Sequence, residues 1–309
     1  MRAATGFRSR VAALVTGLLA LLAIAGCAPA AERVQVVVTT NVLGDITREI
    51  IGDQARISVL MKPNADPHSF GVSAQQAAQF ERADLVIANG LGLEEGVARN
   101  IDAAAQAGVP TLAVGEHVDP LRYAQDESAG APDPHFWTDP VRVARAVDVI
   151  SRHVVEHVDG VDPAVVRANA ERYRGEVEAL HATISEQFAA IPPERRTLVT
   201  NHHVFGYLAQ RYDFEVIGAV IPSGTTLASP SASDLAGLAE QITTEGVPAI
   251  FADTSQPDRL ARALAEQAGV QVRIVPLFSE SLSRPGEGAA TYLEMTTHNA
   301  NAIATALGG

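Results

Sequence analysis

A short frame around histidine occurs twice in the chain and provides residue types suited to metal binding. The sequence Asp-Pro-His ends at His68 and again at His135. Proline fixes its own φ and favours extended geometry before it, so each frame predicts a stiff turn that sets the direction of its histidine. Such turns suit preorganised metal ligands. We expect Asp66 or Asp139 to accept the ring N–H that points away from the metal.

A third histidine frame spans residues 201–207, with the sequence Asn-His-His-Val-Phe-Gly-Tyr. It follows residues 197–200, which we predict to form a strand. Side chains at the carboxyl end of a parallel strand face the crevice of an open α/β sheet, so His202 or His203 is expected to point there. The same pattern also suits a helix start with a buried histidine.

Two carboxylates follow the last two predicted strands and are candidates for a fourth ligand. They are Asp253 and Glu280. Either could instead cap a helix. Three imidazoles and one carboxylate would complete a closed tetrahedral site of the zinc type. The residues alone leave the choice between the two carboxylates open.

The composition narrows the classes of ligand. The 309 residues carry a formal charge of −13 and a single cysteine. One thiol cannot form an internal disulfide or a four-thiolate metal site, so any metal must be bound by histidine and carboxylate. The negative charge disfavours binding to nucleic acid and favours cationic ligands.

The first residues predict export from the cytoplasm. Three arginines precede an uncharged run at 11–24, which as a helix would span about 21 Å and is too short for a bilayer. Ala25-Gly26 directly before Cys27 resembles the cleavage site of bacterial lipoproteins. This resemblance implies a signal peptide at 1–26, lipidation of Cys27 and a tether at 27–33.

The rest of the chain alternates short β-branched runs with helical stretches, which predicts an α/β protein. The predicted helices include residues 93–107, 140–157 and 232–245. We expect two lobes, each a doubly wound parallel sheet, joined by one long rigid helix with the ligand in the cleft between them. The long helix is indicated by apolar residues at helical spacing from Val166 to Ile191, ended by two prolines. The predicted boundaries are 34–160 for the N-terminal lobe, 161–193 for the linking helix and 194–309 for the C-terminal lobe.

The order of these motifs resembles the zinc/manganese substrate-binding lipoproteins of bacterial metal ABC importers, known as cluster A-I. The resemblance rests on the lipoprotein site, both Asp-Pro-His frames, Ala-Asp-Leu-Val-Ile-Ala-Asn-Gly at 83–90, His-x-x-Phe-Gly-Tyr and a C-terminal helix. It implies two α/β lobes bridged by a rigid helix, with a metal buried between them. By position it assigns as ligands His68, His135, His202 and Glu280, with Asp253 as the alternative carboxylate.

Two positions and one loop differ from the common pattern of that family. His203 occupies a position commonly filled by Asp, and Glu280 replaces the commoner Asp. The chain also lacks the long histidine-rich loop of many zinc importers. Residues 119–134 fill that region with Asp126, Glu127 and Asp133 instead, which weakens any metal-collecting role for the loop.

The resemblance implies a carrier and not an enzyme. We expect a lipid-anchored, extracytoplasmic monomer, periplasmic if the cell has an outer membrane, that binds one divalent ion. Zn²⁺ is favoured over Mn²⁺, because imidazole-rich sites suit zinc. The partners would be a permease and its cytoplasmic ATPase, with no nucleic acid. A manganese-specific carrier or adhesin-like lipoprotein is the alternative within this class. Affinity should fall below about pH 6.5, where free imidazole becomes protonated.

One further motif suggests a different class of protein, a zinc metalloprotease. His153, Glu156 and His157 match the His-x-x-Glu-His pattern of some zinc metalloproteases. On a helix the two histidines share a face, so two ligands are geometrically possible. A protease also needs a third ligand and a substrate cleft, and no downstream motif provides them.

Overall fold

The computed structural model describes residues 34–124, 128–269 and 272–308. They belong to one compact unit that begins at Val34. The predicted signal peptide at 1–26, the lipidated Cys27 and the tether at 27–33 lie outside the described residues. Within the described ranges, none of the helices combines the length and the apolar character needed to cross a bilayer.

The first sheet is parallel and buried on both faces. Its strand order is β2-β1-β3-β4. The strands are β1 (Gln35–Val38), β2 (Arg56–Val59), β3 (Leu85–Ala88) and β4 (Thr111–Ala113). All four residues of β3 are buried, which explains why this strand is apolar throughout and does not alternate with polar residues.

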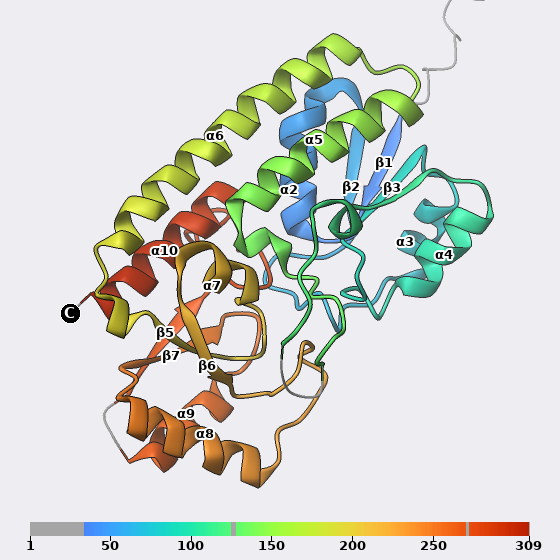
Figure 1. Ribbon diagram of the computed structural model, residues 1–309. Helices are drawn as coiled ribbons and strands as arrows, with labels where there is room; N and C mark the ends of the chain where they lie inside the picture. Colours follow the sequence, from blue (N-terminus) through green and yellow to red (C-terminus); the bar gives the residue numbers. More distant parts are fainter. Residues whose placement is uncertain (1–33, 125–127, 270–271, 309) are drawn as a thin grey trace, which may run out of the picture. The chain divides into compact units, whose positions relative to one another are not determined.

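Helices cover both faces of the first sheet, as Figure 1 shows. Val36 and Val38 face one core, which includes residues of α2 and α5, whereas Val37 faces a second core with Phe80 and Ala104 from α3 and α4. The helices are α2 (Asn41–Ile51), α3 (Ala74–Phe80), α4 (Ala98–Gln106) and α5 (Pro140–His157). The predicted doubly wound arrangement is therefore confirmed.

The second sheet repeats the topology of the first. Its order is β6-β5-β7-β8, again all parallel. The strands are β5 (Thr197–Thr200), β6 (Glu215–Ala219), β7 (Ala249–Asp253) and β8 (Arg273–Leu277). Its helices are α7 (Gly206–Tyr212), α8 (Ala232–Glu245), α9 (Arg259–Ala268) and α10 (Tyr292–Leu307). Leu198 and Val199 face opposite cores, so this sheet is also covered on both sides.

One long helix, α6 (Pro163–Ala189), runs from the first core to the second (Figure 1). Its 27 residues correspond to about 40 Å of helix. Asp162 caps its start by accepting the Ala164 N–H at 2.8 Å, and proline occupies the first helical position. Tyr173 packs in the core of the first sheet and Phe188 in that of the second. The long apolar stripe predicted from the sequence thus joins two cores.

One predicted helix starts later than its apolar pattern indicated. Residues 93–107 were expected to be helical, but α4 begins at Ala98. The preceding turn has Leu91 at a φ of 58° and buries the Glu94 carboxylate. That carboxylate accepts the N–H groups of Asn89 at 2.6 Å and Gly90 at 3.1 Å. These bonds at the end of β3 hold the chain in a turn where spacing alone favoured a helix.

Short 3-10 turns complete the described elements. They are η1 (Gly52–Gln54), η2 (Val114–His117), η3 (Phe136–Thr138) and η4 (Pro193–Arg195). Of these, η3 directly follows His135 and leads through Asp139 into α5. The side chain of Asp139 caps α5 by accepting the Val141 N–H at 3.0 Å. This cap fixes where α5 starts relative to the histidine.

Candidate metal centre

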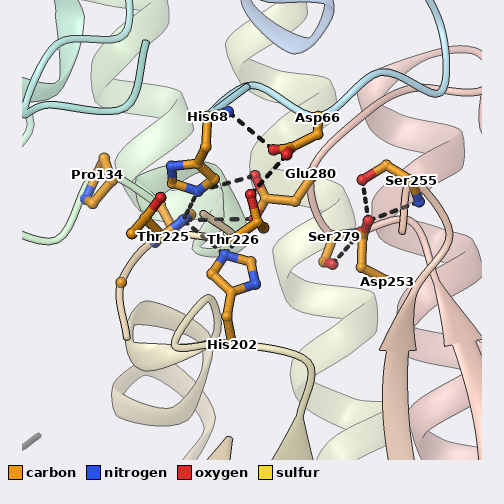
Figure 2. Close-up of polar contacts among 12 residues, drawn as sticks. Asp66, His68, Pro134, His202, Thr225, Thr226, Asp253, Ser255, Ser279 and Glu280 are labelled. Atoms are coloured by element: carbon orange, nitrogen blue, oxygen red, sulfur yellow. Dashed lines mark hydrogen bonds and ion pairs between the residues drawn. The ribbon is translucent and has the colours of Figure 1, made fainter. Parts of the chain in front are cut away.

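Four predicted ligands from distant parts of the chain meet at the carboxyl ends of strands. His68 follows β2, His202 follows β5 and Glu280 follows β8, while His135 lies between β4 and α5. Figure 2 shows His68 and His202 converging from opposite sides on Glu280. Carboxyl ends of parallel strands are where α/β sheets bind ligands, so the topology places these side chains as expected.

The distances among the four side chains match the size of a tetrahedral metal site. The Nε2 atom of His135 lies 3.4 Å from Nε2 of His68 and 3.4 Å from Nε2 of His202. Glu280 oxygens lie 3.1 Å from His202, 3.5 Å from His135 and 3.9 Å from His68. Ligands bonded at zinc distances are about 3.3–3.4 Å apart in a tetrahedron. The four residues form the one such group within the described part of the chain.

The site is closed to solvent. Each of the four side chains belongs to a residue that is 2% exposed or less. Neither Glu280 oxygen accepts a hydrogen bond among the described residues. A buried carboxylate is costly unless a cation or donors compensate it, so this group fits a bound cation better than a purely structural role.

Burial sets the protonation states in the site. It lowers the pKa of His68 to about 2, with the neighbouring histidines adding to the effect. Burial also lowers the pKa of His135 and of His202. It raises the pKa of the Glu280 carboxyl well above its usual range, and nearby acidic groups raise it further. The imidazoles are therefore held neutral, which is the form that binds metals.

We predict that His68 does not titrate between pH 7.5 and 5.0 in the metal-free protein, because its folded pKa lies near 2. This revises the expectation that imidazole protonation weakens the site below about pH 6.5. The unfolded chain takes up a proton below that pH, so the stability contributed by this group is present above about 6.5 and lost as pH falls. Histidine NMR shifts, assigned with His68→Gln, test this. A titration midpoint near 6.5 would contradict it.

The ring of His135 is oriented by Asp133, a role that sequence reasoning gave to Asp66 or Asp139. The Asp133 carboxylate lies 2.8 Å from Nδ1 of His135 and accepts its backbone N–H at 2.9 Å. Burial raises the pKa of Asp133 to about 7, and the hydrogen bond from the His135 backbone N–H opposes this rise. Asp66 instead accepts the backbone N–H of His68 at 3.0 Å, and Asp139 caps α5. The sequence signal that could have identified Asp133 is its position as the first residue of the Asp-Pro-His frame that ends at His135.

Replacing Asp133 with asparagine should weaken zinc affinity by about 10–100-fold, because partners of this kind fix the tautomer and direction of a ligating histidine. Isothermal titration of the metal-free variant measures the effect. The control is Asp119→Asn, since the Asp119 side chain is 75% exposed and lies in the same loop. Equal affinities for the two variants would show that Asp133 does not act on the metal through His135.

Two residues of the His-x-x-Phe-Gly-Tyr motif lie against the same aspartate, Asp133. Tyr207 donates its hydroxyl to the backbone carbonyl of Asp133 at 2.6 Å. A Cβ atom on Gly206 would lie 2.9 Å from an Asp133 carboxylate oxygen, so glycine allows the start of α7 to approach it. Helix α7 of the second sheet thus helps to position His135, a predicted ligand that follows the first sheet.

The structure separates the alternatives that the sequence left open. Asp253 lies outside the four-residue group, and its carboxylate accepts hydrogen bonds from Ser255 and Ser279 (Figure 2). His203 also lies outside the group, with its backbone N–H donating to the Ser223 carbonyl at 3.0 Å. Of these candidates, Glu280 and His202 are the two whose side chains lie beside His68 and His135.

The protease motif does not assemble a site in the described residues. His153 and His157 lie side by side on α5, with ring centroids 4.3 Å apart and the ring planes tilted by 51°. Glu156 lies on the same helix, and the described residues bring no third ligand to this pair. In the loop at 119–134, Asp126 lies outside the described residues, as does Glu127, while Asp133 is buried against His135.

Comparisons with known proteins agree with this fold. Residues 36–306 match the family model described as ZnuA, zinc-uptake complex component A, periplasmic. The manganese-binding lipoprotein MntA of Halalkalibacterium halodurans is 27% identical over 277 residues, covering 89% of each chain. The iron-binding protein YfeA of Yersinia pestis is 27% identical over 285 residues, covering 90% of this chain and 88% of YfeA.

A solved structure extends the comparison to the fold. The periplasmic zinc-binding protein TroA of Treponema pallidum superposes with a TM-score of 0.81 at 28% identity, covering 90% of this chain and all of TroA. The chain therefore belongs to the family of zinc-uptake complex component A, the extracytoplasmic metal-binding substrate proteins of ABC transporters, which carry ions and are not enzymes.

Proposed function

We propose that this protein binds one divalent transition-metal ion through His68, His135, His202 and Glu280 and delivers it to an ABC importer. The observation that carries the proposal is Glu280, a fully buried carboxylate whose oxygens accept no hydrogen bond among the described residues and face three imidazoles. A dication bound there would compensate the carboxylate and use the free lone pairs of the neutral rings.

Zn²⁺ is the ion that the donor set favours over Mn²⁺. Three imidazoles and one carboxylate at tetrahedral spacing suit zinc, whereas manganese prefers octahedral oxygen ligands. The relatives are named for manganese, iron and zinc, so their names do not choose among metals. A manganese-specific carrier or adhesin-like lipoprotein is the second candidate, supported by MntA.

The closed site supports carriage and delivery. Four protein ligands fill a tetrahedron, which leaves no position for a substrate water of the kind a zinc hydrolase needs. Release must therefore separate the ligands, and a permease that prefers the separated form would draw the metal out. The permease would act with its cytoplasmic ATPase.

We also propose that the mature chain begins at Cys27 and is held at the membrane by lipid on that thiol, with 27–33 as the tether. Support comes from the sequence before Cys27 and from relatives named as lipoproteins. Two acyl chains give stable anchoring where one is marginal. The protein would act as a monomer outside the cytoplasm, with the lobes at 34–160 and 194–309 and the linking helix at 161–193.

The test is a metal titration of the soluble form that lacks residues 1–27. Wild type should bind one Zn²⁺ per chain at sub-micromolar concentration and more tightly than Mn²⁺. His135→Ala should lose this binding, while His153→Ala, which removes a histidine of the protease motif, should retain it. Loss of zinc only in the His153 variant, or no tight binding by wild type, would overturn the proposal.

A further inference from the structure

The Asp66 carboxylate connects loops of the second sheet to the backbone turn that carries His68, a proposed metal ligand. One oxygen, Oδ1, accepts the backbone N–H of His68 at 3.0 Å. The other, Oδ2, accepts Thr226 Oγ1 at 2.7 Å and Gln256 Nε2 at 2.9 Å, in addition to Ser69 Oγ at 2.8 Å. Asp66 is buried, so this carboxylate depends on these donors for its solvation.

The two distant donors come from the opposite side of the site. Thr226 lies between β6 and α8, and Gln256 lies between β7 and α9, whereas Asp66 follows β2 of the first sheet. Figure 2 shows Thr226 reaching Asp66 beside His68. Neither donor belongs to the four-residue metal group. Among the described residues, their side-chain hydrogen bonds reach the site through Asp66.

His68 differs from His135 in what holds its ring. The Nδ1 atom of His135 lies 2.8 Å from Asp133 and 3.2 Å from the Tyr123 hydroxyl. The Nδ1 atom of His68 has no hydrogen-bond partner among the described residues. The direction of the His68 ring therefore depends on its backbone turn, and Asp66 is the side chain that fixes this turn.

Resting on the proposed function, we propose that Thr226 and Gln256 are positioning residues that set how long the bound metal is retained. They hold the Asp66 carboxylate against the second sheet's loops, and through it they keep His68 within reach of the other three ligands. When the two donors withdraw, the turn is freed and His68 becomes the first ligand to leave. The Asp66 contact is thus the part of the closed site that an importer would need to open.

The neighbouring Thr225 provides a matched control. Its hydroxyl donates to Glu95 at 3.2 Å, a second contact between the same loop and the residues that follow β3. Glu95 is exposed, and among the described residues its side chain hydrogen-bonds to Thr225 and to neither Asp66 nor His68. Removing the Thr225 hydroxyl therefore perturbs the same loop by the same chemical change without releasing Asp66.

The experiment measures zinc association and dissociation rates of the mature chain by stopped-flow mixing with a chromophoric chelator. The variants are Thr226→Val, Gln256→Met and their double, with Thr225→Val as the control and Thr226→Ser as the conservative replacement. The double variant should release zinc at least about 10-fold faster, because each lost bond has a charged acceptor. Association should change less than about twofold, and Thr226→Ser and Thr225→Val should resemble wild type.

Two results would overturn the inference while leaving the proposed function intact. One is zinc release by the double variant at the wild-type rate. The other is equal acceleration by Thr226→Val and either Thr226→Ser or Thr225→Val, which would indicate general loosening of the loop. Melting of the metal-free variants identifies loss of folding. A wild-type chain that binds no zinc would instead overturn the proposed function itself.

Discussion

Replacing Glu280 with glutamine should weaken zinc binding by more than about 100-fold, a larger effect than loss of a group that only orients a ligand. The substitution removes the one anionic ligand while preserving the volume of the side chain. Because the carboxyl is fully buried without hydrogen-bond donors among the described residues, the metal-free protein should be as stable as wild type or more stable. Titration calorimetry and urea unfolding measure the two effects.

Asp253→Asn is the control for this prediction. It makes the same chemical change at the alternative carboxylate, which lies outside the metal group and accepts bonds from Ser255 and Ser279. We expect this variant to retain most zinc affinity and to lose stability. The reverse pattern, with affinity lost in the Asp253 variant and kept in the Glu280 variant, would move the fourth ligand to Asp253.

Asp139→Ala should lower the free energy of unfolding by about 3–5 kcal/mol, because it leaves the buried Arg142 guanidinium with only the exposed Asp119 carboxylate, 3.8 Å away, as an ionic partner. Asp139 is fully buried and pairs with Arg142 at 2.6 Å and with Arg211 at 2.9 Å. Arg142 is itself only 4% exposed. The pair with Arg211 also joins α7 to the start of α5. Urea unfolding of the metal-free protein measures the loss.

The control for that substitution is Asp162→Ala. Asp162 is exposed, and it caps α6 just as Asp139 caps α5, in each case directly before a proline. Loss of a cap alone costs about 1 kcal/mol. Equal destabilisation by the two variants would mean that the ion pairs of Asp139 contribute nothing beyond its cap.

Local signals in the sequence predicted several elements to the residue. The helix predicted at 140–157 matches α5, where Asp139 and Pro140 mark the start, and the helix predicted at 232–245 matches α8, which Ser231 caps. The delayed start of α4 was missed because its cause is tertiary. Glu94 accepts the Thr39 hydroxyl at 2.7 Å across the sheet, a contact that local spacing does not encode.

The sequence predicted the candidate ligands of the site better than the residues that position them. The repeated Asp-Pro-His frame indicated His68 and His135, but the choice of Glu280 depended on resemblance, since nothing local distinguishes it from Asp253. The two frames also have the same sequence and different contacts. Asp133 meets the ring of its histidine, whereas Asp66 is drawn to donors on the second sheet's loops. That difference is determined by tertiary packing.

X-ray absorption at the zinc edge of the zinc-loaded wild type tests the central claim most directly. If His68, His135, His202 and Glu280 bind the ion, the first shell contains three imidazole nitrogens and carboxylate oxygen at about 2.0–2.1 Å, with no sulfur. A shell with fewer than three imidazoles, or one made mainly of oxygen, would contradict the proposed site.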